Sequence, residues 1–326
     1  MKTKAPNFVS RWAGTVKSFN NTGVLLIMLL FIVIVVIVAG PAKFFNPGNL
    51  TSMIRSVSVV GIMACAFTLV MVTGNIDLSL GWMVGLGACI CAANSAHTVT
   101  AILMPILVCG ICGAFNGLLV GHLKLNAFIT TLGTMYIFQG IAYLYADAQQ
   151  KTMIGTNGSP VLKFLGQGSL LGIPVPVWLF FLFALIFGFI LSRTGFGTRV
   201  YAVGANSVVS RFSGISSGSV IFTTYLLGGL VAGLASVIFF SKVMATQVYS
   251  GQGLEFSVLS GIVLGGTSVT GGKGNVVGTV LGVVFVGILL NGFTLMGLSA
   301  NVQYVAQGLI LLIAIRADAM QSRGLR

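Results

Sequence analysis

Acidic residues and histidines are scarce in this sequence. Its 326 residues include four Asp or Glu and two His. A catalytic site needs such groups within hydrogen-bond reach of one another, and Asp77, Asp147, Glu255 and Asp318 lie far apart along the chain. We therefore expect no catalytic residues and no enzyme activity in this chain.

Cysteines are few and lie inside apolar runs. A zinc site needs clustered ligands in a polar setting, and no His, Asp or Glu stands beside any of the five cysteines. We expect small, buried packing residues, no metal site and no cofactor bound by this chain. The cysteines are Cys65, Cys89, Cys91, Cys109 and Cys112.

Charge of either sign is rare. Only 6% of the residues are charged and 56% are hydrophobic, whereas a soluble domain is roughly 25% charged. This composition predicts an all-α polytopic membrane protein. The net charge of +13 is compatible with a nucleic-acid partner. However, the basic residues are scattered at the ends of apolar runs, which is typical of topology signals, so we expect no nucleic acid.

Apolar runs predict about ten transmembrane helices. Residues 57–93 are too long for one span of roughly 20 residues, and we place a break at 74–77, where Gly, Asn and Asp interrupt the run. The expected organisation is an N-terminal tail (1–22), a membrane domain (23–316) and a C-terminal tail (317–326). The other predicted spans are 23–40, 99–121, 127–146, 175–192, 219–240, 257–270, 276–292 and 302–315; residues 147–174 read as an extramembrane loop.

The distribution of Lys and Arg predicts the orientation. With the N-terminus inside, twelve of the 17 basic residues fall on the cytoplasmic side, together with both termini. Residues 193–214 contain three arginines and no acid, so we expect a cytoplasmic loop. Within it, residues 205–212 favour a short helix with Asn206 or Ser207 as N-cap.

Two weakly similar halves are indicated by a faint repeat. Asn116-Gly117 is followed by Asn126 at the same spacing as Asn291-Gly292 by Asn301, and Gly133 and Gly308 share the same offset. Repeated halves are common in transporters, where the pathway forms near the repeat interface.

The glycine-rich residues 265–274, G-G-T-S-V-T-G-G-K-G, fail the pattern of a phosphate-binding loop at two positions. We therefore expect no nucleotide hydrolysis by this chain. Many of the 44 glycines are expected at close helix contacts instead. These are Gly81, Gly85, Gly87, Gly228, Gly229, Gly233, Gly278, Gly282 and Gly287.

Uncharged polar residues and two acids within or beside the spans are candidates for a solute pathway. For each one the alternative is a hydrogen bond that only holds helices together. Glu255, at the end of a span, is expected to line an entrance or to pair with Lys242. The candidates are Asn75, Asp77, Ser79, Asn116, Asn126, Glu255, Asn291 and Gln303.

Three stretches, in order along the chain, resemble the membrane permease family of monosaccharide-type ABC importers. Residues 74–81, G-N-I-D-L-S-L-G, are similar to that family's G-G-I-D-L-S-V-G; residues 198–215 are similar to its G-x-x-V-Y-A-I-G-G-N-x-x-A-A-x-x-S-G-I; and residues 265–279 are similar to G-G-T-S-L-x-G-G-x-G-x-x-x-G-T. Asn75 and Ala205 replace glycines of these patterns, and Ser257 stands where an acid often follows Glu255.

The resemblance implies an importer in a bacterial inner membrane. Its partners would be ABC ATPase subunits that use ATP and Mg²⁺, a periplasmic sugar-binding protein, and a second permease copy or a paralogue. Residues 193–214 would then couple the permease to the ATPase. The residues assigned to coupling are Arg199, Gly204, Asn206, Ser207, Arg211 and Gly214.

A transporter driven by an ion gradient, or a channel, is the alternative. It would need a titratable or ion-binding cluster in the membrane, and Asp77 is the only acid that the sequence places deep in a span.

Overall fold

The computed structural model describes residues 21–146, 153–154 and 159–323, and this part of the chain is almost entirely helical. Most of the N-terminal tail and the residues Asp147 and Lys151 lie outside the described residues. The helices are α2 (Asn21–Ala39), α3 (Pro41–Phe44), α4 (Pro47–Val72), α5 (Leu80–Ala93), α6 (Thr98–Gly117), the π-helical turn η1 (Leu118–His122), α7 (Ala127–Tyr145), α8 (Pro160–Gln167), α9 (Val175–Arg193), α10 (Gly195–Ala205), α11 (Ser207–Phe212), α12 (Ser217–Val243), the 3-10 turn η2 (Val248–Gly251), α13 (Leu254–Leu264), α14 (Val276–Leu295) and α15 (Ala300–Arg323).

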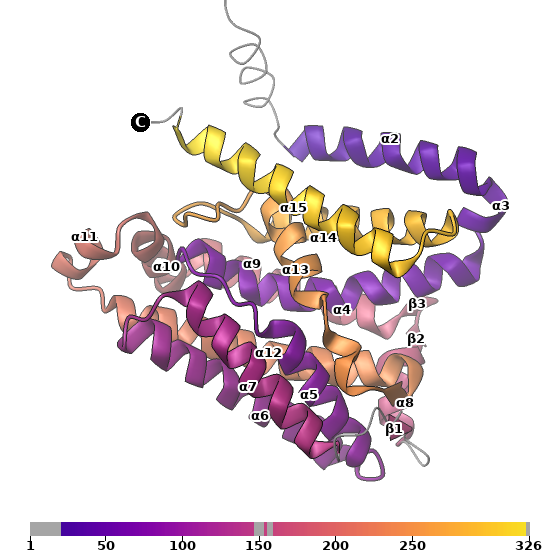
Figure 1. Cartoon of the computed structure of the whole chain (residues 1–326), viewed down its shortest axis with the longest axis horizontal. Helices are drawn as coiled ribbons and strands as arrows, with labels where there is room; N and C mark the ends of the chain where they lie inside the picture. Colours follow the sequence, from indigo (N-terminus) through magenta and orange to yellow (C-terminus); the bar gives the residue numbers. More distant parts are fainter. Residues whose placement is uncertain (1–20, 147–152, 155–158, 324–326) are drawn as a thin grey trace, which may run out of the picture.

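Strands are limited to short pairs. β1 (Met153–Ile154) pairs antiparallel with β4 (Ala245–Thr246), and β2 (Ser169–Leu170) forms a hairpin with β3 (Ile173–Pro174). The predicted loop 147–174 therefore contains a helix and a hairpin in its described part. These elements lie together at one end of the molecule, opposite α10 and α11 (Figure 1).

Six helices of the described chain are long and apolar enough to cross a membrane, which confirms a polytopic all-α protein. They are α4, α6 with η1, α7, α9, α12 and α14. Helix α5 and the apolar parts of α2 and α15 are shorter. At 1.5 Å per residue, the 11 residues of α13 extend about 16 Å, against about 30 Å of hydrocarbon. Residues 257–270, expected as one span, are thus a half-length helix followed by a loop.

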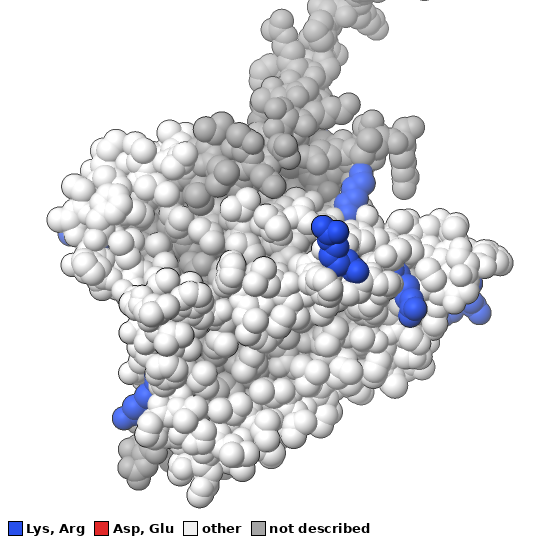
Figure 2. Space-filling view, turned by 180° about the vertical axis from the view of Figure 1, so that it is seen from behind, with Lys and Arg blue, Asp and Glu red and all other residues white. Residues whose placement is uncertain are grey.

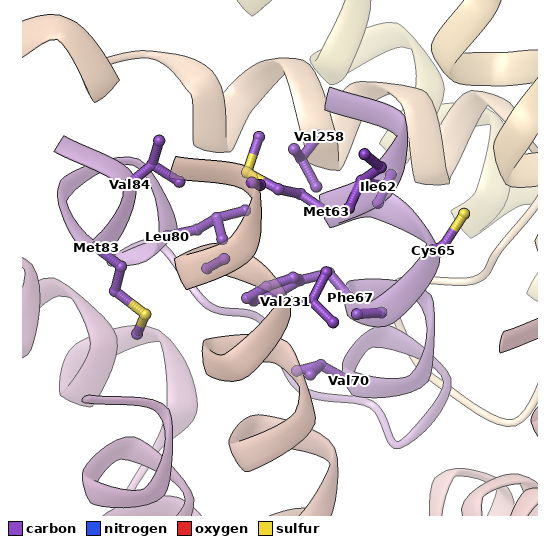
Figure 3. Packing of buried hydrophobic residues seen from close by; sticks show 14 of the residues in the cluster. Ile62, Met63, Cys65, Phe67, Val70, Leu80, Met83, Val84, Val231 and Val258 are labelled. Atoms are coloured by element: carbon purple, nitrogen blue, oxygen red, sulfur yellow. The ribbon is translucent and has the colours of Figure 1, made fainter. Parts of the chain in front are cut away.

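Helices α4 and α12 form the centre of the bundle. Their apolar windows are 72% and 61% buried, against 33%, 22% and 28% for α6, α7 and α9, whose outer faces are apolar. The two helices are antiparallel: the Lys242 amine at the end of α12 donates to Ser56 Oγ near the start of α4, at 3.1 Å. Figure 3 shows side chains of α4 and α12 meeting those of the short helices α5 and α13.

Glycines allow α6 and α12 to pack backbone against backbone. A methyl group at Gly113 would lie 2.4 Å from the Tyr225 carbonyl oxygen, and one at Gly229 would lie 2.3 Å from the Cys109 carbonyl oxygen. Small residues are the usual means of such close approach in a membrane. All nine glycines predicted at helix contacts have a close neighbour from another segment, so that prediction is confirmed; for Gly87, Gly228 and Gly287 the neighbour is a side chain.

The central helices are interrupted twice. We call residues 73–79, between α4 and α5, the first break, and residues 244–253, between α12 and α13, the second break. Helix α4 ends at the predicted place because Gly74 adopts φ +80°, and the Gly74 and Asn75 amides bond back to Met71 and Val70. Each break is followed by a helix too short to span a membrane by itself.

Exposed basic residues favour the α10 and α11 end. Figure 2 shows several of them toward that end, and no acidic residue on the face that it draws. The distribution agrees with the predicted division of charge between the two sides. Exposed at that end are Lys124, Arg193, Arg199, Arg211, Lys273 and Arg316.

Candidate functional site

The first break is held by a buried polar network. Asp77 Oδ1 accepts hydrogen bonds from the Ser79 amide at 2.8 Å and from the Ser79 hydroxyl at 2.6 Å. Asn116 Nδ2, from α6, donates to Asp77 Oδ2 at 3.2 Å and to Ser79 Oγ at 2.9 Å. None of the three side chains is more than 2% exposed. The carboxylate thus lies at the N-terminus of α5, where the helix dipole favours negative charge.

Two further helices fix the backbone of this break. Thr131 Oγ1 of α7 accepts from the Leu78 amide at 3.2 Å, and the Tyr225 hydroxyl of α12 donates to the Ile76 carbonyl at 2.8 Å. No pattern in the sequence pairs these residues with the break. A lone tyrosine in the apolar run of α12 was the only available signal.

Glu255, in the first turn of α13 just after the second break, folds back onto the start of its own helix. Its carboxylate oxygens lie 3.2 Å and 3.1 Å from the Gly253 amide that donates to them, and the side chain is 4% exposed. The expected pair with Lys242 does not form, because the Lys242 amine donates to Ser56 instead. The carboxylate lies against Gly81 of α5, where a methyl group would be 2.0 Å from Glu255 Oε2.

The two breaks therefore meet. Gly251, just before α13, packs on Gly81 and Gly85 of α5, and a methyl group at Gly251 would lie 2.0 Å from the Gly81 carbonyl oxygen. Asp77 and Glu255 thus occupy the starts of two half-length helices in contact, whereas the sequence showed them only as isolated acids.

Of the remaining pathway candidates, Asn75 lies in the first break, and Asn126, Asn291 and Gln303 lie outside both breaks. Asn291 exchanges amide hydrogen bonds with Asn49 of α4, at 2.8 Å and 3.3 Å. Gln303 links α15 to α14 through Thr294 Oγ1 at 3.3 Å. Asn126 is an exposed N-cap of α7, and Asn75 donates to Thr73 Oγ1 at 2.9 Å. Their role in a pathway stays a prediction.

Residues 193–214 are more ordered than a loop. They form the end of α9, then α10 and α11. Of the two predicted N-caps, Asn206 and Ser207, the structure has Asn206. Its side-chain oxygen accepts hydrogen bonds from the Val208 and Val209 amides, each at 3.0 Å. Helix α11 ends at Phe212, and the turn after it contains Gly214, whose φ of +78° a residue with a side chain rarely adopts; the Ile215 amide bonds back to the Ser210 carbonyl.

The surface of α11 is apolar as well as basic. Arg211 and Arg199 are exposed, and so are Val208 and Val209, while Phe212 is 89% exposed. We call these five residues, with the N-cap Asn206 and the first helical residue Ser207, the coupling surface, after the role predicted for residues 193–214.

Gly204 has a different position from the other residues assigned to coupling. A methyl group at Gly204 would lie 1.8 Å from the Val72 carbonyl oxygen and 2.6 Å from the Gly272 amide. Gly204 therefore joins α10 to the end of α4 and to the glycine-rich segment 265–275. In that segment the Tyr201 hydroxyl donates to the Gly274 carbonyl at 2.6 Å, and the Gly272 amide donates to Val72.

No group of three or more His, Cys, Asp or Glu in the described chain is arranged to hold a metal ion. The five cysteines are buried and make no disulfide.

Comparison with known proteins identifies the family to which the chain is similar. The model of the family described as "Branched-chain amino acid transport system / permease component" matches residues 49–315. The chain is 37% identical over 283 residues to the ribose import permease protein RbsC of Bacillus subtilis (strain 168), covering 86% of this chain and 87% of that protein. It is 33% identical over 279 residues to RbsC of Escherichia coli (strain K12), with 85% and 87% covered.

The L-arabinose ABC transporter permease protein AraH of Azospirillum brasilense is 30% identical over 314 residues, covering 94% of this chain and 89% of that protein. No solved structure matches the chain. The long apolar helices are consistent with these similarities, which cover most of the chain. The chain therefore belongs to the branched-chain amino acid transport system / permease component family, and the ribose and arabinose permeases are its relatives.

Proposed function

We propose that this chain is the transmembrane subunit of an ATP-driven importer that passes a monosaccharide from a periplasmic binding protein to the cytoplasm. The main support is the similarity, over most of both chains, to permeases named for ribose and arabinose import. ABC ATPase subunits bind and hydrolyse ATP with Mg²⁺, and this chain binds no cofactor of its own. It lies in the bacterial inner membrane as a multi-pass protein.

The coupling surface is the docking site for the ATPase in this proposal. The six-residue helix α11 is capped at its start by the Asn206 side chain, and its Val208, Val209 and Phe212 side chains are exposed. Apolar side chains with Arg at the rim are typical of the centre of a protein interface. Gly214 allows the tight turn after α11, and Gly204 allows α10 to pack closely against the end of α4. Both glycines thereby help to position the coupling surface.

For the topology we propose ten membrane segments, with α5 and α13 as half-length segments and both termini in the cytoplasm. Six exposed basic residues at the α10 and α11 end support this orientation. A second copy of the chain, or a paralogue, completes the permease. The pathway follows Asn75, Asp77, Ser79, Asn116, Asn126, Glu255, Asn291 and Gln303.

ATP acts on the permease only through different contacts in its two states. The coupling surface is joined to the first break through α10, Gly204 and Val72. A shift of α10 would therefore move the first break and the start of α5. From α5 it would be passed to the second break by the contact of Gly81 with Gly251.

The test is uptake by proteoliposomes that contain the permease, the ATPase encoded beside it and the cognate binding protein. We expect radiolabelled D-ribose, L-arabinose, D-xylose or D-galactose to accumulate only with ATP and the binding protein present, and not with a hydrolysis-deficient ATPase. Accumulation by the permease alone, driven by a proton or sodium gradient, would instead establish the alternative of a secondary transporter.

A further inference from the structure

A cavity of about 270 Å³ lies between α4, α13 and α14, at the end opposite the coupling surface. Its polar lining consists of Ser52 and Ser56 from α4, Ser257 from α13, and Asn291 and Thr294 from α14. The rest of the wall is mainly valine and leucine. A few placed polar groups on an apolar wall are typical of small-molecule sites.

Ser257 contributes a hydroxyl to this wall. Its side chain is 5% exposed and lines the cavity, and no hydrogen bond joins its hydroxyl to another described residue. The Ser257 hydroxyl is therefore available to a molecule inside the cavity.

The opposite wall is fixed in position. Asn291 and Asn49 hold each other by two amide hydrogen bonds, which set the orientation of Asn291. Ser56 accepts from the Lys242 amine at 3.1 Å and donates to the Ser52 carbonyl at 3.0 Å. The amide and hydroxyl groups facing the cavity thus offer both donors and acceptors, and no carboxylate or cation lines it.

The cavity is closed toward the α10 and α11 end. There α13 and α14 meet backbone to backbone: methyl groups at Gly282 and Gly278 would lie 2.0 Å from the carbonyl oxygens of Gly261 and Gly265. A second cavity of about 460 Å³ shares Ser52 with the first and is lined by Arg55 and Lys242.

The size of the cavity selects one sugar ring. Its volume of about 270 Å³ is near the lower end of the range of roughly 300–1,000 Å³ for small-molecule sites, which suits a single ring better than a disaccharide. Sugar hydroxyls match the mixed donors and acceptors, while the C–H face of the ring fits the valines.

We propose that this cavity is a binding site of the permease itself for one neutral monosaccharide, with Ser257, Asn291 and Ser52 as its hydrogen-bonding groups. The inference rests on the proposed function and adds a site within the membrane subunit. On the predicted orientation the site receives the sugar from the binding protein, before the helix contacts below it separate.

The native cysteines make a direct test possible, because all five are buried. In a Ser52→Cys variant of the detergent-purified full chain, only the cavity thiol is expected to react quickly with a membrane-impermeant maleimide. D-ribose, L-arabinose, D-xylose or D-galactose at millimolar concentration should slow that reaction at least threefold. The matched control is Val161→Cys, on exposed α8 at the same end, whose labelling should not change.

Uptake by the complete transporter gives the second readout. Ser257→Ala removes a hydroxyl that holds nothing in the protein, so the chain should fold, and sugar uptake should fall about two- to tenfold, the effect of one hydrogen bond. Ser192→Ala, which removes an exposed hydroxyl bonded within α9, should leave uptake unchanged.

The outcomes separate the two proposals. If the wild-type transporter imports a sugar but no sugar protects Ser52→Cys and Ser257→Ala transports normally, this site is wrong and the proposed function stands. Equal protection of Val161→Cys, or protection by D-glucuronate as strong as by the neutral sugars, also overturns it. If no sugar is imported with ATP and the binding protein, the proposed function itself fails.

Discussion

Asn116 on α6 and Asp77 in the first break are joined by a hydrogen bond of 3.2 Å between Nδ2 and Oδ2, although 39 residues separate them in sequence. We expect Asn116→Ala to lower the free energy of unfolding by about 1–3 kcal/mol, because the buried Asp77 and Ser79 oxygens lose a donor. Thermal unfolding of the detergent-solubilised chain, followed by size-exclusion chromatography, measures the effect. Asn301→Ala, at an exposed position of α15, is the control and should be neutral. Equal stability of the two variants would contradict the structural role of the network.

The close packing of α6 on α12 predicts that replacing glycine by alanine destabilises the chain at this contact and not at an open position. Gly113→Ala should destabilise the chain by about 1–3 kcal/mol, because its methyl group would lie 2.4 Å from a backbone oxygen that cannot retreat. Gly133→Ala, on α7 with open space around it, should be neutral or stabilise by up to about 1 kcal/mol. The same thermal assay compares them, and a reversed order would mean that the two helices are not packed in this way.

The coupling surface predicts a selective loss of ATPase binding. Phe212→Ala should reduce the amount of ATPase that co-purifies at least fivefold, because Phe212 is the most exposed apolar side chain of α11. Arg211→Glu should weaken binding in the same direction. Phe189→Ala removes an equally apolar side chain, 62% exposed on α9, and should not affect it. Normal association and uptake with Phe212→Ala would remove α11 from the interface.

The turn after α11 predicts an effect without any change in the docking side chains. Gly214→Ala forces a side chain into φ +78°, at a cost of about 1–2 kcal/mol, and should loosen α11. Gly195→Ala is the control, since it has open space and an ordinary φ. Proteolysis between α10 and α12 should be faster in the first variant only; similar rates would show that the cap is dispensable.

The Tyr201 hydroxyl predicts a contribution that is constant over ordinary pH. Burial raises the pKa of Tyr201 above its usual 10.0, so the donor to the Gly274 carbonyl is fully protonated below pH 10.0 and is lost only as the pH rises through the raised value. Tyr201→Phe should therefore cost about 0.5–1.5 kcal/mol at pH 6 and equally at pH 9. A difference between variant and wild type that changes within this range would be inconsistent with the assignment.

Local signals in the sequence predicted local features well. The end of α4 at Gly74 and the N-cap Asn206 follow from backbone chemistry that a few neighbouring residues determine. The glycine contacts were predictable because a side chain at those positions is incompatible with close helices.

Contacts between distant segments were not predictable in the same way. The bond of Asn116 to Asp77 depends on α6 lying beside the first break, and the Asn49–Asn291 pair depends on α4 lying beside α14. The apolar pattern continues past Leu264 into glycines, so the end of α13 was hidden. Lys242 and Glu255 are close in sequence, yet their side chains bond elsewhere.

The contact between the two breaks bears on the leakage of protons. Gly81 and Gly251 touch through backbone atoms, and the nearby Asp77 and Glu255 side chains are almost fully buried, so no water fits between the two glycines. We expect a permease closed in this way to conduct few protons while it is idle. The absence of side chains at these two glycines would then limit leakage as well as allow movement.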